Sequence, residues 1–221
     1  MKNQKRRSAL LAGLSLILMA IIAGFTYGYA HSVIYVPGNA AQSMTNLQLN
    51  KWLFISEFVG WTLICLVDGI VVMALYVFLK GVNPKLSGLA AFLRLIYTAF
   101  LGYAVWQLGE LLPLNDNLSA AQVNSQFEAF ESIWSMGLII FGAHLSTLGL
   151  LALKAPSISK VFGWLLMLAG ISYLGIHLAK LLLEGQANTI AEVEVILSAP
   201  MALGELAFAV WLITKGGKST Y

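Results

Sequence analysis

The chain has 221 residues, of which 59% are hydrophobic and only 10% are charged, and its formal net charge is +3. Soluble domains usually carry about 25% charged residues, so this composition excludes an ordinary water-soluble protein and indicates one whose solvent is lipid. The small positive charge suits segments that meet anionic headgroups and gives no reason to expect a nucleic-acid partner. The lipid bilayer is therefore the partner that the composition predicts.

Six apolar stretches follow one another along the chain, each longer than the roughly 20 residues that a spanning helix needs. They predict an all-α, polytopic membrane protein, a six-transmembrane-helix bundle that forms one domain over residues 1–221. Turn-forming residues such as Pro37-Gly38, Asn83-Pro84 and Pro156 fill the gaps. The expected helices are, in chain order, 8–30, 52–79, 86–112, 127–153, 161–183 and 190–214.

The first stretch resembles a secretory signal peptide, because basic residues precede it and it ends at Gly28-Tyr29-Ala30. A cleaved signal has an apolar region of about 7 to 15 residues, and the stretch from Ser8 to Ala30 is longer. We therefore expect an uncleaved first helix. The charge pattern is compatible with either outcome, since removing this helix leaves the orientation of the other five unchanged.

Basic residues outside the helices fall almost entirely in every second gap. Lys and Arg are held on the cytoplasmic side during insertion, so the pattern predicts a multi-pass protein of the bacterial inner membrane with both the N-terminus and the C-terminus in the cytoplasm. The only basic residues in the first expected periplasmic gap are His31 and Lys51. The residues expected on the cytoplasmic side are Lys2, Lys5, Arg6, Arg7, Lys80, Lys85, Lys154, Lys160, Lys215 and Lys218.

Four ionisable side chains share one depth inside the expected helices. A charge in a spanning helix costs about 2.5 to 3.5 kcal/mol, so it faces protein or water and pairs with something. At about 1.5 Å per residue from the cytoplasmic ends, these side chains lie roughly 12 to 17 Å deep. Two acids, one arginine and one histidine in one layer can neutralise one another, and this layer is the expected ligand or proton site. It consists of Asp68, Arg94, His144 and Glu205.

A second group of polar residues is expected nearer the outer surface. Glu57 and Asp68 lie eleven residues apart, as do Glu194 and Glu205, and this spacing puts each pair on one helix face. Those two faces could line a polar path to the inner layer. Glutamates near the membrane surface are equally explained as solvated rim residues, and His177 as a hydrogen-bonded core residue. The secondary polar stripe is Glu57, Gln107, Glu110, Tyr173, His177 and Lys180, with Glu184 continuing it.

As a hypothesis, the inner layer binds a small solute or couples a proton in transport or sensing. Asp68 or Glu205 would be the acceptor, Arg94 an anion clamp or counter-ion, and His144 the titrating group, whose ordinary pKa is about 6.5. One alternative is a membrane-embedded enzyme that uses His144 with Asp68 or Glu205. Another is a structural or partner-binding subunit in which the charges only hold the bundle together.

No metal and no cofactor are expected. A zinc hydrolase needs three ligands and an open position, and Arg94 beside one histidine and two acids would oppose a cation. The sequence does not predict the ligand, any catalytic residue or the oligomeric state.

Three motifs carry a resemblance to a known family: Phe92-Leu93-Arg94-Leu95, the run from Gly137 to His144, and the run from Val161 to Leu174. With Glu205 and the Lys215-Gly216 end, they resemble the bacterial integral membrane family catalogued as domain of unknown function family 4386. The resemblance covers nearly the whole chain, and it implies a fold and a location but no activity. Members often carry Arg and Pro before the fifth helix, where this chain has Lys154 to Ser157.

Overall fold

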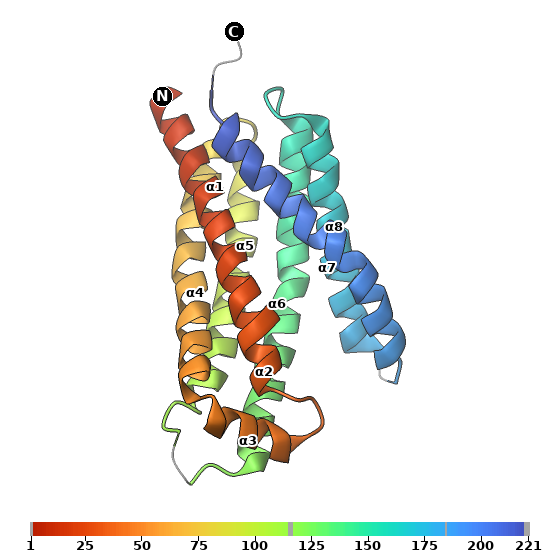
Figure 1. Cartoon of the computed structure of the whole chain (residues 1–221). Coiled ribbons are helices and arrows are strands. Elements are labelled where there is room, and N and C mark those ends of the chain that lie inside the picture. The colour runs from red at the N-terminus through yellow and green to blue at the C-terminus, as the bar shows by residue number, and fades with distance from the viewer. Residues whose placement is uncertain (1, 115–116, 184, 219–221) are drawn as a thin grey trace.

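Six long helices stand side by side in the computed structural model, which describes residues 2–114, 117–183 and 185–218 (Figure 1). These ranges contain no strand, and six helical segments are long and apolar enough to cross a membrane. The expected all-α, six-helix bundle is therefore confirmed. The elements are α1 (Lys2–Phe25), the π-helix η1 (Thr26–His31), α2 (Ser32–Ile34), α3 (Ala40–Leu49), α4 (Lys51–Leu79), α5 (Pro84–Gly109), α6 (Ala120–Lys154), α7 (Lys160–Leu182) and α8 (Ala187–Thr214).

Capping residues explain where several helices begin. The Asn83 side chain accepts a hydrogen bond from the backbone N–H of Leu86, and Pro84 occupies the first turn of α5, where its missing N–H costs nothing. Ser119 and Gln122 form a capping box at the start of α6. This cap starts α6 at Ala120, earlier than the residue 127 expected from hydrophobicity, because a capped polar turn can extend a helix beyond its apolar part.

The first spanning helix is longer than expected. The sequence predicts its end at Ala30, whereas η1 and α2 continue it, and the apolar span runs from Asn3 to Ile34. The extension passes through a π-helical turn, a form that is rare and often found at functional sites. His31 therefore lies on a spanning helix rather than in a loop.

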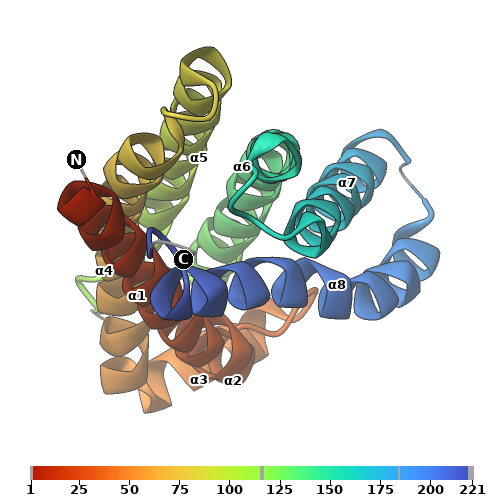
Figure 2. The same ribbon diagram turned by 90° about the horizontal axis from the view of Figure 1, so that it is seen from above.

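The six spanning helices form a closed ring. Each packs against its neighbours in chain order, and α8 packs back against α1 (Figure 2). Glycines allow the closest of these approaches: a Cβ atom on Gly170 of α7 would lie 2.6 Å from the carbonyl oxygen of Gly142 on α6. Small residues at such positions are the usual way in which membrane helices come into contact.

Hydrogen bonds between the start of α1 and the end of α8 close the ring. The guanidinium of Arg6 donates to the carbonyl oxygens of Leu212, Ile213 and Gly216, at 2.6 to 3.0 Å. The positive charge of the Arg6 guanidinium also interacts favourably with the negative, C-terminal end of the α8 dipole. Farther from the termini the two helices separate (Figure 1).

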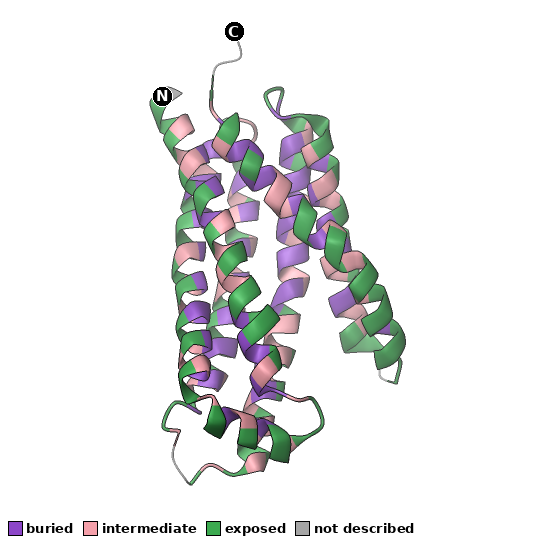
Figure 3. Cartoon of the chain, in the orientation of Figure 1, coloured by how far each residue is buried: buried purple, intermediate pink, exposed green. Residues whose placement is uncertain are grey.

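Exposed residues cover the outward faces of the helices, and buried ones face the interior (Figure 3). Many of the exposed side chains are large and apolar, among them Leu66, Met73 and Ile171. Apolar surface on this scale is suited to lipid and would be a liability in water. The start of α1, the end of α8 and the links after α4 and α6 lie at one end of the bundle (Figure 1). Helix α3 lies at the other end, where it packs against α6.

Candidate functional site

The centre of the bundle holds a buried ion pair between α4 and α5. Nε and Nη2 of Arg94 each lie 2.6 Å from Oδ1 of Asp68, and the residues are 1% and 0% exposed. The hydroxyl of Thr98 donates to Oδ2 of Asp68, so both carboxylate oxygens are used. Of the two acids expected in the inner layer, Asp68 is therefore the one that pairs with Arg94.

His144 of α6 completes this network as a neutral ring. Its Nδ1 lies 2.8 Å from the carbonyl oxygen of Ala90 and must donate to it, and its Nε2 lies 3.2 Å from Nη1 of Arg94. A guanidinium only donates, so Nε2 has to accept and carries no proton. The ring is 1% exposed, and both of its nitrogens are occupied. Arg94, Asp68 and His144 thus satisfy one another.

Glu205 of α8 is not part of that network. It lines a cavity of about 310 Å³ to which all six spanning helices contribute, and Arg94 lies in the same wall. Within the described ranges no side chain hydrogen-bonds or ion-pairs with Glu205. Three of the four residues expected in the inner layer therefore meet directly, and the fourth faces the cavity beside them.

A second hollow of about 490 Å³ adjoins the first. The two share the side chains of Trp134, Leu138, Tyr173 and Ala202 in their walls. His177 lines the second hollow, and its Nδ1 is hydrogen-bonded to the hydroxyl oxygen of Ser135 at 2.7 Å. An ion pair between Nζ of Lys180 and Oε1 of Glu194, 2.7 Å apart, also lines this hollow. A continuous line of polar and aromatic groups thus leads from this ion pair to Glu205.

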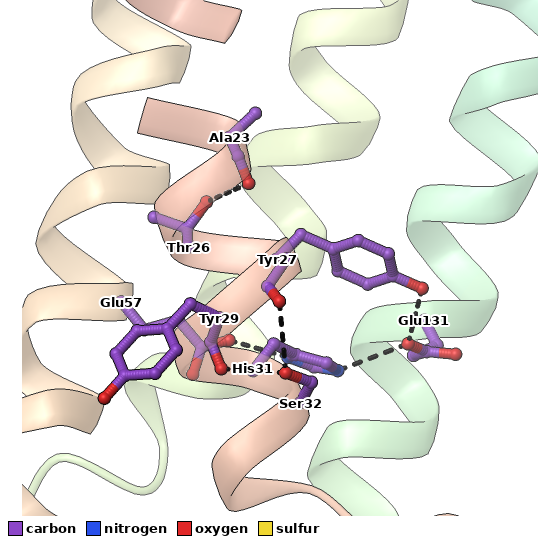
Figure 4. Close-up of polar contacts among 9 residues, drawn as sticks. Ala23, Thr26, Tyr27, Tyr29, His31, Ser32, Glu57 and Glu131 are labelled. Carbon is purple, nitrogen blue, oxygen red and sulfur yellow. Dashed lines mark hydrogen bonds and ion pairs between the residues drawn. The ribbon is translucent and has the colours of Figure 1, made fainter. Parts of the chain in front are cut away.

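A third polar cluster is centred on His31 (Figure 4). Two of its members, Tyr27 and Glu131, line the second hollow. His31 Nδ1 lies 2.6 Å from Oε1 of Glu57, and its Nε2 lies 3.2 Å from Oε1 of Glu131. The hydroxyl of Tyr27 donates to the same Glu131 oxygen, and the Tyr27 ring stacks on His31 at 5.3 Å. A protonated His31 ring would donate toward both carboxylates.

The carboxylates of this cluster lie against opposite nitrogens of the ring and do not converge on one point. In the part of the chain that the structure describes, no group of three His, Cys, Asp or Glu side chains is placed to hold a metal ion. The cluster instead links η1 to α4 and α6. The interpretation of Glu57 as a solvated rim residue is wrong, because its side chain is 0% exposed.

The secondary polar stripe divides in the structure. Tyr173, His177 and Lys180 lie together along the second hollow. Gln107 bonds only to its own helix, and Glu110 is exposed near the end of α5, so neither reaches a hollow that contains the rest of the stripe. Glu57 pairs with His31. Glu184 lies outside the described residues.

Sequence reasoning missed His31 and Glu131 as members of a site. Gly28-Tyr29-Ala30 looked like a helix end, which placed His31 in a loop. One weak signal was available: the apolar residues Val33 and Ile34 follow His31 and Ser32.

Comparison with known proteins gives a family and a relative. The family described as "Domain of unknown function (DUF4386)" matches residues 11–216. An "Uncharacterized protein" of Archaeoglobus fulgidus is 32% identical over 164 residues, which are 74% of this chain and 86% of that protein. No solved structure matches the chain. The expected family is confirmed, and neither match indicates an activity or a bacterial source.

Replacing Arg94 by alanine should lower the thermal stability of the protein in detergent, because it leaves Asp68 charged and unpaired in the bundle. Breaking a buried pair in this way typically costs about 3 to 5 kcal/mol. The double change Arg94→Ala with Asp68→Asn should recover part of that loss.

Lys180→Ala provides the matched control, since the side chains of Lys180 and Glu194 are 38% and 32% exposed. An exposed pair of this kind contributes about 0 to 1 kcal/mol, so the melting temperature should change little. An unchanged melting temperature for Arg94→Ala would contradict the central role of the pair.

Proposed function

Because the chain belongs to the family described as domain of unknown function (DUF4386), its activity has to be inferred from its own site, and we propose that it binds a small solute in the central cavity and couples that binding to a proton on Glu205. Such a protein would act in transport or in sensing.

One observation carries this proposal: the carboxyl group of Glu205, which has no hydrogen-bond or ion-pair partner among the described residues, lines a cavity of about 310 Å³ in the middle of a membrane bundle. Ionisable groups inside a membrane are costly and usually mark substrate pathways or proton relays. The volume is within the size range of small-molecule sites, and the lining combines apolar and aromatic side chains with few polar groups, as such sites do.

The neighbouring network has a supporting part in this proposal. Arg94, Asp68 and His144 are buried and mutually satisfied, so they hold α4, α5 and α6 in place around the cavity. The enzyme alternative gains no support from the contacts of His144, because a general acid or base needs a nitrogen free to reach the substrate and both of its nitrogens are occupied.

The proposal predicts that Glu205 exchanges a proton with water through the cavity. Infrared difference spectra of the protein in lipid, recorded between acid and alkaline solution, should show a protonated-carboxyl band that is absent in Glu205→Gln. Glu192→Gln, a change at an exposed acid on the same helix, should retain it. If Glu205→Gln keeps the whole band and its pH dependence, Glu205 is not the coupling group.

We also propose that the protein resides in the inner membrane with both termini in the cytoplasm. The alternation of basic residues supports this orientation. The start of α1, the end of α8 and the links after α4 and α6 also lie together at one end of the bundle (Figure 1). Reporter fusions after Arg7, Lys85, Lys154 and the C-terminus should score cytoplasmic, and fusions near Asn39 and Asn117 periplasmic. A periplasmic C-terminus would rule out this orientation.

A further inference from the structure

The inner polar layer lacks one positive charge. The sequence suggested that Asp68, Arg94, His144 and Glu205 neutralise one another, which requires a charged histidine. The structure instead holds His144 as a neutral acceptor toward Arg94. With Glu205 ionised, two carboxylates then face one guanidinium, and that guanidinium is already paired with Asp68. No further positive side chain among the described residues lines the cavity, so the negative charge of Glu205 would be neutralised by a proton or by another cation from outside the protein.

Aromatic side chains line the same cavity as Glu205. A cation within about 6 Å of an aromatic ring is attracted by the negative face of the ring, and cages of this kind recognise organic ammonium groups. Arg94 already makes one such contact, with its Cζ 5.4 Å from the centroid of Phe141. The aromatic residues that line the cavity are Trp61, Tyr97, Trp134, Phe141 and Tyr173.

The second hollow extends the same chemistry outward. Trp134 and Tyr173 belong to both walls, and the carboxylates of Glu131 and Glu194 line the outer one. Its one lysine, Lys180, is neutralised by Glu194 at 2.7 Å. A positively charged solute would thus meet acids and aromatic faces along the whole route, whereas an anion would meet no unpaired positive side chain among the described residues that line it.

We propose that the solute of the central cavity is a small organic ammonium ion, held by the carboxylate of Glu205 and by the faces of Trp134 and Tyr173. This inference rests on the proposed binding function and names its substrate class. Proton and ammonium ion are alternative counter-ions of the same carboxylate, so binding of one excludes the other.

Several titratable and charged groups face Glu205 across the cavity and set the background for this competition. The part of α1 that lines the cavity is apolar. The other elements contribute Arg94 and Tyr97 from α5, Tyr173 from α7, and Asp68 of α4 and His144 of α6 through the buried network.

The test uses the full-length protein in lipid nanodiscs and follows probe binding by calorimetry and by quenching of tryptophan fluorescence. The cationic probes are tetramethylammonium, choline and tetraethylammonium. Dimethylbutanol, which replaces the choline nitrogen by carbon, is the neutral isostere, and benzoate is the anionic probe. At least one cation should bind, and choline should bind more tightly than its isostere by about tenfold or more.

Three further results are expected. Glu205→Gln should weaken binding of the cation by about tenfold or more, while Glu192→Gln should leave it unchanged. Trp134→Leu should weaken it with less effect on the neutral isostere, because only the cation uses the face of the ring. Acid solution should weaken cation binding to the unaltered protein, a result that does not depend on the folding of any variant.

The outcomes separate this inference from the proposed function. Equal binding of choline and its isostere, preferential binding of benzoate, or no binding of any ammonium probe overturns the assignment of an organic cation. If the pH-dependent carboxyl band of Glu205 persists in that case, proton coupling at the site still stands. If the unaltered protein shows neither the pH-dependent carboxyl band of Glu205 nor binding of any probe, both the organic-cation assignment and the proposed function are overturned.

Discussion

The ion pair between Arg94 and Asp68 determines how the centre of this bundle is arranged. A guanidinium buried among apolar helices has to be matched where it lies, and here it binds a carboxylate on α4 and an imidazole on α6 at once. One side chain of α5 thereby fixes three neighbouring helices. The other three are held by different means: glycine contacts join α7 to α6, and Arg6 fastens α8 to α1. The cavity lies where these two differently held sets of helices face each other.

Glu205 differs from the other three residues of the inner layer, because Asp68, Arg94 and His144 already have one another as partners. Both oxygens of Asp68 and both nitrogens of His144 already have partners, and the two side chains are buried, so neither is open to a ligand. Glu205 faces open volume instead, with Arg94 close enough to share a cavity wall but committed to another carboxylate. The structural and the ligand-binding interpretations of the inner layer therefore apply to different residues: three of them serve as scaffold, and the fourth is available for a ligand.

Much of this arrangement follows from the sequence, because the rise of a helix converts residue number into depth. Counting along the helices was enough to group Asp68, Arg94, His144 and Glu205. Depth is only one coordinate, however, and the partner of Arg94 depends on which helices are neighbours and how each is rotated. Gln107 and Glu110 show the same limit, since their depth suits the outer path but their helix face does not. His31 was not predicted as a site residue, and the reason is local. A π-helical turn carries the first helix past Gly28-Tyr29-Ala30, and hydrophobicity alone did not distinguish this turn from a helix end.

The neutral ring of His144 leaves Glu205 without a counter-charge of its own among the described residues. Nitrogen NMR of the imidazole rings tests it directly, and the chain has only three histidines, so His144→Gln would assign the signal. At neutral pH we expect a neutral ring for His144, protonated at Nδ1 and unprotonated at Nε2. A His144 ring that carries protons on both nitrogens would itself neutralise the inner layer, and Glu205 would then need no outside cation.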